Sequence, residues 1–106
     1  MTRQVKLAAA HVAPVFMDAM ASAEKAVEWI KKAGREEVNL VVFPEVFLPG
    51  FPYWINCYAP LLQTSLNTRY QQESVTVDGP EVALLVAACR DANVSVVMGA
   101  SERRVE

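Results

Sequence analysis

The sequence predicts an α/β fold with elements in the order β-α-β-α-β. Three mainly apolar runs, at residues 5–13, 36–44 and 94–102, indicate buried strands. Two amphipathic runs, at residues 18–34 and 78–93, lie between them and indicate helices. The first three elements form a β-α-β unit, which favours a parallel strand pair with a right-handed crossover.

Capping residues define the predicted helices. Asp18 is placed to cap the first helix, and Gly34 is a suitable residue for its C-terminal end. Asp78 or Gly79 caps the second helix, and Pro80 suits its first turn. The apolar stripes are Ala19, Ala23, Ala26, Val27 and Ile30 on the first helix, and Val82, Leu85, Val86 and Cys89 on the second. Residues 47–77 are rich in turn signals, with one or two short helices expected among them.

Composition narrows the class of protein. Hydrophobic residues make up 53% of the 106 positions and charged residues 21%, a balance that is globular rather than disordered. The net charge is −2 and no basic run exceeds two residues, which argues against nucleic acid or an anionic membrane surface as a partner. No run approaches the roughly 20 apolar residues of a transmembrane helix. His11, Pro14 and Asp18 interrupt the apolar start of the chain, so it is not interpreted as a targeting segment.

The two cysteines, Cys57 and Cys89, are far apart in the sequence, and the chain has one histidine. A zinc site is therefore not expected, and no metal is predicted. One disulfide is possible, but free thiols in a reducing cytoplasm are the preferred interpretation.

A single carboxylate stands out in "VVFPEVFLPGFPYWI", residues 41–55. Glu45 follows an apolar run and Pro44, and no other charge lies within the next ten residues. Sites in open α/β sheets form beyond the carboxyl ends of the strands. Glu45 lies at such an end, as do His11 and Glu102, and an apolar setting suits a carboxylate to proton transfer. The alternative for Glu45 is a carboxylate with a structural salt bridge. For His11 and the Glu102–Arg103 pair a structural role is the preferred interpretation.

Three segments of the sequence resemble segments of a known protein family. "FPEVFLPGFPYWI" resembles the glutamate motif of the nitrilase superfamily, the carbon–nitrogen hydrolases, and in particular its true nitrilase branch. "VKLAAAHVAPVFMD" resembles the family's first strand and the turn after it. "DGPEVALLVAACRDANVSVVMGASER" resembles its second main helix and third strand. The sequence departs from the family at His11, where glutamine is common, and at Phe51, where tyrosine is more frequent.

The resemblance implies an α-β-β-α sandwich of two sheets covered by helices. It also implies a Glu-Lys-Cys triad that works without a cofactor. In that triad the cysteine attacks a nitrile or amide carbon, the lysine stabilises the developing charge, and the glutamate acts as general base. By its motif Glu45 is the family's glutamate. Tyr53 and Trp54 lie in a segment that the resemblance places close to the active site, so both are candidates for substrate binding, with loop packing or a subunit contact as the alternative.

The triad's lysine and cysteine have no counterparts in the sequence. All four lysines precede Glu45, Cys57 lies in the irregular segment, and Cys89 lies on a helix stripe. Residues 1–106 are therefore expected to be the N-terminal portion of a single nitrilase-like catalytic domain, apparently truncated after "RRVE" and inactive by itself.

Two classes of function remain open. In the first, the chain belongs to a cytoplasmic, homo-oligomeric nitrilase that converts a small-molecule nitrile and water to a carboxylic acid and ammonia. An amidase or carbamoylase of the same superfamily, acting on an amide, is the alternative enzyme, and "LPGFPYWI" favours the nitrilase. In the second class the chain is a non-catalytic association module that pairs through an uncovered sheet.

Overall fold

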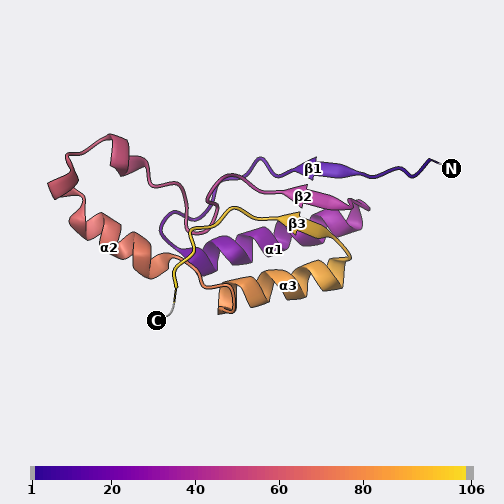
Figure 1. Ribbon diagram of the computed structural model, residues 1–106. Helices are drawn as coiled ribbons and strands as arrows, with labels where there is room; N and C mark the ends of the chain where they lie inside the picture. The colour runs from indigo at the N-terminus through magenta and orange to yellow at the C-terminus, as the bar shows by residue number, and fades with distance from the viewer. Residues whose placement is uncertain (1, 105–106) are drawn as a thin grey trace.

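The computed structural model describes residues 2–104 and shows one parallel sheet with helices packed on it (Figure 1). The α/β class and the predicted element order are confirmed, although each strand is only three residues long. The elements are β1 (Leu7–Ala9), α1 (Ala19–Arg35), β2 (Leu40–Val42), the 3-10 helices η1 (Tyr53–Asn56) and η2 (Pro60–Leu62), α2 (Thr64–Glu73), α3 (Pro80–Ala92) and β3 (Ser95–Val97).

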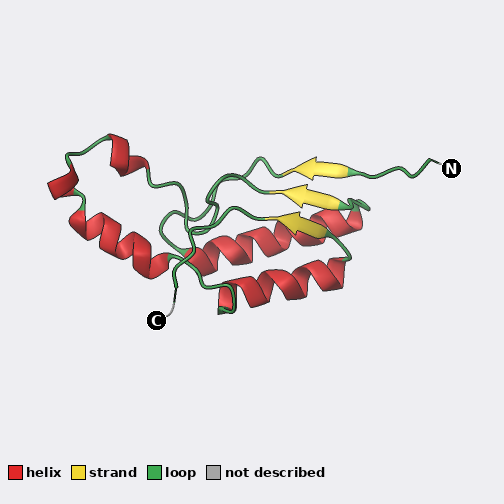
Figure 2. Cartoon of the chain, in the orientation of Figure 1, coloured by secondary structure: helices red, strands yellow, loops and turns green. Residues whose placement is uncertain are grey.

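The sheet has the strand order β1-β2-β3, and both strand pairs are parallel, as the β-α-β pattern predicts. Helices α1 and α3 lie side by side on one face of it (Figure 2). Ala8, Val41 and Val96 share a register position and belong to the core beneath these helices. The next position along, at Val42 and Val97, points to the opposite face and is exposed. The expectation of strands buried on both faces is therefore met on one face only within residues 2–104, because no described element covers the other.

Helix α1 begins as the sequence predicts and ends differently. The Ala21 N–H donates to Asp18 Oδ1 over 2.9 Å, which confirms Asp18 as the N-cap. The predicted C-terminal role of Gly34 is wrong, since the helix continues through Arg35. A Cβ at Gly34 would lie 2.9 Å from both the Cβ and the carbonyl oxygen of Ala92. Glycine is needed there because α1 and α3 approach closely, and that long-range contact leaves no local signal in the sequence.

Helix α3 is capped by Gly79, not by the side chain of Asp78, and Pro80 occupies its first turn. It ends at Asn93, whose φ of 54° lies in the left-handed region. The buried residues of α3 are Leu85 and Ala88. Val86, predicted to be in the apolar stripe, is exposed, because it lines an open groove beside the edge strand β3 that no described element covers.

The irregular segment forms an arm that extends away from the sheet, with η1, η2 and α2 along it (Figure 1). Trp54 Nε1 donates to Asn67 Oδ1 over 2.8 Å, which ties η1 to α2. At the tip of the arm Leu61 is 91% exposed and Leu62 is 70% exposed. None of the described helices is long and apolar enough to cross a membrane.

Candidate active site

Glu45 lies in the turn that follows β2, at the carboxyl end of the sheet. Its side chain is exposed to solvent and faces a cavity of about 550 Å³. Among residues 2–104, Glu45 is the only carboxylate that lines this cavity, and the other lining residues are apolar or aromatic: Val12, Ala13, Pro14, Phe16, Pro44, Phe51 and Tyr53. The arrangement places one acid against a mainly apolar surface, as in ligand sites that combine apolar walls with a few polar groups.

Two buried side chains anchor the turn that carries Glu45. Phe47 and Leu48 are 0% and 1% exposed, and Phe47 packs against Phe43 with ring centroids 5.2 Å apart. The Gly50 N–H donates to the Val46 carbonyl over 2.9 Å and closes the turn. The apolar residues on either side of Glu45 therefore hold its backbone while its side chain stays accessible.

A second loop completes the cavity. The segment between β1 and α1 is held against the Glu45 turn by a hydrogen bond from the Met17 N–H to the Pro49 carbonyl over 3.0 Å. Gly50 has a φ of 122°, and a Cβ there would lie 3.1 Å from the ring of Phe16. Glycine at this position thus permits both the left-handed backbone and the close approach of Phe16.

The two aromatic residues predicted to bind substrate have different positions. Tyr53 is exposed, lines the cavity and packs against Phe51 with ring centroids 5.1 Å apart. Trp54 is 6% exposed and does not line the cavity. Its indole ring packs edge-on against Phe16, at 6.0 Å, and against Tyr70, at 5.3 Å. Trp54 therefore lies behind the cavity wall and supports Phe16.

Sequence reasoning missed Phe16 and Phe51 as lining residues. Both lie in segments that follow a strand. A position beyond the carboxyl end of a strand is the sequence signal that could have identified them as lining residues. It was used for the polar residues and not for the aromatic ones.

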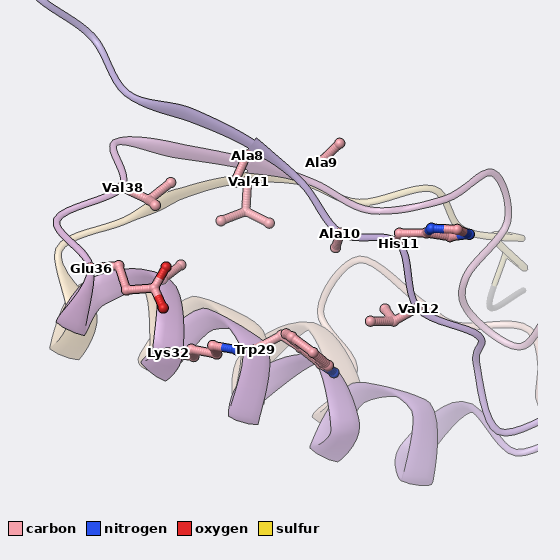
Figure 3. A pocket seen from close by; sticks show the side chains of 11 residues that line it. Ala8, Ala9, Ala10, His11, Val12, Trp29, Lys32, Glu36, Val38 and Val41 are labelled. Atoms are coloured by element: carbon pink, nitrogen blue, oxygen red, sulfur yellow. The ribbon is translucent and has the colours of Figure 1, made fainter.

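His11 lies in a different cavity, of about 340 Å³, between β1 and α1 (Figure 3). Trp29 and Lys32 of α1 border it, with the Lys32 ammonium 5.1 Å from the centroid of the Trp29 ring. Glu36 also lines this cavity. His11 is exposed and does not line the cavity of Glu45, although the two cavities adjoin at Val12, which lines both.

Glu102 follows β3 and is paired by an isolated bridge with Val75. The Arg103 side chain does not contact it through an ion pair: its Nε donates to the Ser74 carbonyl over 2.9 Å. Within residues 2–104 the one salt bridge joins Glu28 and Lys31 on α1. Arg103 therefore connects the last described residues to the C-terminal end of α2 through a hydrogen bond. Glu102 does not line the cavity of Glu45.

The thiols and the described acidic groups form no second reactive cluster. Cys57 is exposed, Cys89 is half-buried, and both are free thiols. Burial raises the pKa of the Cys89 thiol above its ordinary value. Among residues 2–104 no group of three or more His, Cys, Asp or Glu side chains is placed to hold a metal ion.

The chain is similar to enzymes that act on nitriles. It is 44% identical over 103 residues to an aliphatic nitrilase from Rhodococcus rhodochrous, a match that covers 96% of this chain and 28% of that enzyme. It is 38% identical over 100 residues to an arylacetonitrilase from Hypocrea virens (strain Gv29-8 / FGSC 10586), covering 94% and 30% of the two chains. A third relative is an arylacetonitrilase from Aspergillus oryzae (strain ATCC 42149 / RIB 40), 36% identical over 99 residues, covering 93% and 29%.

The chain thus spans less than a third of the length of these relatives. Residues 6–106 match the carbon-nitrogen hydrolase family, and this match includes the Glu45 turn and all three strands. The chain belongs to the carbon-nitrogen hydrolase family.

Proposed function

We propose that residues 1–106 are the N-terminal portion of a nitrilase catalytic domain and that Glu45 is its general base. The observation that carries the proposal is the position of Glu45, the only carboxylate of the described part of the chain that lines an apolar cavity at the carboxyl end of a parallel sheet. A general base must be accessible to the group from which it takes a proton, and the exposed side chain of Glu45 meets that requirement.

The relatives and the cavity both support a nitrile as the proposed substrate. The three relatives are named for aliphatic nitriles or arylacetonitriles. The cavity walls are apolar and aromatic, which suits the organic group of a nitrile. We assign to the whole enzyme the hydrolysis of a small-molecule nitrile to a carboxylic acid and ammonia, in the cytoplasm and without a cofactor.

Tyr53 and Trp54 contribute to this site in different ways. Tyr53 lines the cavity and is placed to contact the organic group of the substrate. Trp54 supports the ring of Phe16 from behind. Trp54 therefore contributes to substrate binding only indirectly, through the position of Phe16.

The other reactive groups of the triad are assigned to segments beyond these 106 residues. Neither Cys57 nor Cys89 lines the cavity of Glu45, and no lysine does. The isolated chain is accordingly expected to release no ammonia from nitriles. Ammonia release by the isolated chain that disappears in Glu45→Ala would contradict this division of roles.

A chimaeric enzyme tests the proposal. Residues 1–106 replace the matching segment of the Rhodococcus rhodochrous nitrilase, and ammonia release from aliphatic and aromatic nitriles and from the matching amides is measured. Nitrile turnover is expected, and Glu45→Gln should lower kcat by about 10²- to 10⁴-fold, because a general base contributes that much. The matched control is Glu36→Gln, which removes the carboxylate of the separate cavity in Figure 3 and should leave kcat unchanged.

Two results would refute the proposal. One is a chimaera that is folded by circular dichroism yet inactive on every nitrile. The other is a Glu45→Gln variant with the kcat of the parent chimaera. Hydrolysis of amides without hydrolysis of nitriles would instead indicate the amidase or carbamoylase branch.

One observation favours association with other chains as a second candidate function. The sheet face opposite α1 and α3 exposes Leu7, Val42 and Val97, and exposed apolar sheet faces promote pairing. In a homo-oligomeric nitrilase this face and the tip at Leu61 and Leu62 are available for contacts with other segments or subunits. In a non-catalytic protein the same face would be the functional surface.

A further inference from the structure

Gly99, two residues after β3 ends at Val97, lies directly against the backbone of the turn that carries Glu45. A Cβ added at Gly99 would lie 2.6 Å from the Val46 nitrogen, 2.9 Å from the Pro44 carbonyl oxygen and 3.2 Å from the Glu45 carbonyl carbon. The two shorter distances are below any that real Cβ atoms adopt. All three neighbours are backbone atoms, which cannot rotate away as the end of a side chain does. Only glycine at position 99 permits this approach.

Hydrogen bonds on both sides of the turn keep its backbone in contact with β3. Before the turn, the Phe43 N–H donates to the Val97 carbonyl over 3.0 Å. After it, the Leu48 N–H donates to the Gly99 carbonyl over 3.3 Å, and the Ser101 N–H donates to the Leu48 carbonyl over 2.8 Å. Residues 44–47 lie between these hydrogen bonds, and their backbone contacts Gly99 in the segment that follows β3.

The turn itself has an unusual backbone. Val46 has a φ of 45°, in the left-handed region that a β-branched residue rarely adopts. Such a conformation persists only where the surroundings impose it. The bonds to β3 and the contact with Gly99 are the surroundings that do so here. The direction of the Glu45 side chain is thus set by a backbone that β3 holds in place.

We propose that Gly99 is a positioning residue for Glu45. Its missing side chain lets β3 support the backbone of residues 44–46, and this fixes the carboxylate beside Phe16, Phe51 and Tyr53. The proposal rests on the proposed role of Glu45 as general base. Gly99 does not line the cavity, so its effect on the reaction passes through the position of Glu45.

The test compares two glycine substitutions of similar steric severity in the chimaeric enzyme. Gly99→Ala displaces the Glu45 turn, and kcat is expected to fall about 10²-fold, because a displacement of about 1 Å has that effect on a catalytic group. KM should change less than kcat, since the cavity walls from the β1–α1 loop stay in place. Gly34→Ala is the matched control: its Cβ would lie 2.9 Å from Ala92, between α1 and α3 and away from the cavity. It should lower the Tm and leave kcat unchanged.

Two outcomes would overturn the proposal: a folded Gly99→Ala enzyme with the kcat of the parent, or equal losses of kcat in both glycine variants. If circular dichroism shows that Gly99→Ala does not fold, the double variant Gly99→Ala with Val46→Gly is measured instead. The Val46→Gly substitution lets the backbone of the turn move away from the added methyl group. A refolded double variant should keep a low kcat, and a parental kcat would refute the role of Gly99. Failure of the proposed function is recognised separately, by a Glu45→Gln enzyme that keeps its activity.

Discussion

The ring of Phe16 shows how a single side chain links the sheet, the arm and the cavity. It is 52% exposed, lines the cavity of Glu45 on one side and packs against Trp54 on the other. The Trp54 indole is itself fixed by Asn67 and by Tyr70. Because its neighbours are fixed, Phe16 forms a preformed apolar surface, and in the proposed nitrilase such a surface would lower the entropic cost of substrate binding.

Truncation of Phe16 should weaken substrate binding. In the chimaeric enzyme, Phe16→Ala is expected to raise KM for nitriles with bulky apolar groups by about tenfold, since burying a large apolar side chain against another is worth about 1.5 to 3 kcal/mol. Steady-state kinetics on a series of nitriles of increasing size measures the effect. Phe16→Leu is the control and should retain most of the affinity, whereas an unchanged KM in Phe16→Ala would show that the ring does not contact the substrate.

The two thiols should differ in reactivity. Cys57 is exposed, while Cys89 is half-buried on α3 and burial raises its pKa. Since the thiolate is the reactive form, iodoacetamide should modify Cys57 roughly tenfold faster than Cys89 near pH 8. Peptide mass spectrometry of a time course provides the rates. In denaturant both sites should react alike, and a faster reaction of Cys89 in the native chain would contradict its placement on α3.

At the scale of elements, α2 is joined to the segment after β2 and to α1 by polar contacts from its C-terminal end. The Tyr70 hydroxyl donates to the Gly50 carbonyl over 2.9 Å, in the turn that follows Glu45. Glu73 accepts a hydrogen bond from the Ala19 N–H at the first turn of α1. No residue of α2 is fully buried. Its position therefore depends on these bonds and on the Trp54–Tyr70 contact more than on apolar burial.

Tyr70 should make stability depend on alkaline pH. Burial raises the pKa of Tyr70 above 10.0, and the neighbouring Ser101 hydroxyl opposes part of this shift. The fold thus favours the neutral phenol. This contribution is fully present below pH 10.0, the value in the unfolded chain, and is lost as the pH rises through the higher folded value.

Urea unfolding of the chain between about pH 8 and about pH 11 tests this prediction. Tyr70→Phe should be less stable by about 1 kcal/mol near pH 8, because the bond to the Gly50 carbonyl is lost. The difference between the two proteins should shrink as the pH rises above 10.0. A difference that grows with pH would show that the phenolate is favoured in the fold.

For the molecule as a whole, the decisive feature is a sheet of which the described elements cover one face. Leu7 on β1, Val42 on β2 and Val97 on β3 are exposed on the opposite face. Val42 and Val97 are direct partners in the strand register, so they form one continuous apolar strip. Such a strip favours association in water.

The isolated chain should therefore self-associate through this strip. Light scattering with size-exclusion chromatography is expected to show a mass that rises with concentration. The variant Val42→Lys with Val97→Glu should shift the population to the monomer, and the opposite charges of the register pair should keep the strands together. The control places opposite charges at the tip, Leu61→Glu with Leu62→Lys. Loss of association in the control alone would make the tip the interface.

The sequence by itself determined the element order, the parallel sheet, the N-cap at Asp18 and the location of Glu45 at the end of β2. These features depend on periodicity and capping within short segments, which local residue patterns record directly. The family motif around Glu45 belongs to the same local kind of information.

Only the tertiary structure decided which residues meet at the site. Phe16 and Glu45 lie far apart in the sequence but line one cavity. They do so because the loop between β1 and α1 packs against the turn that carries Glu45, where the Met17 N–H donates to the Pro49 carbonyl. Trp54 is turned away from that cavity, and Gly34 and Gly99 are required by close approaches between segments remote in sequence. Such approaches depend on how elements pack, and a single glycine in a local pattern cannot distinguish a helix end from a place where two backbones touch.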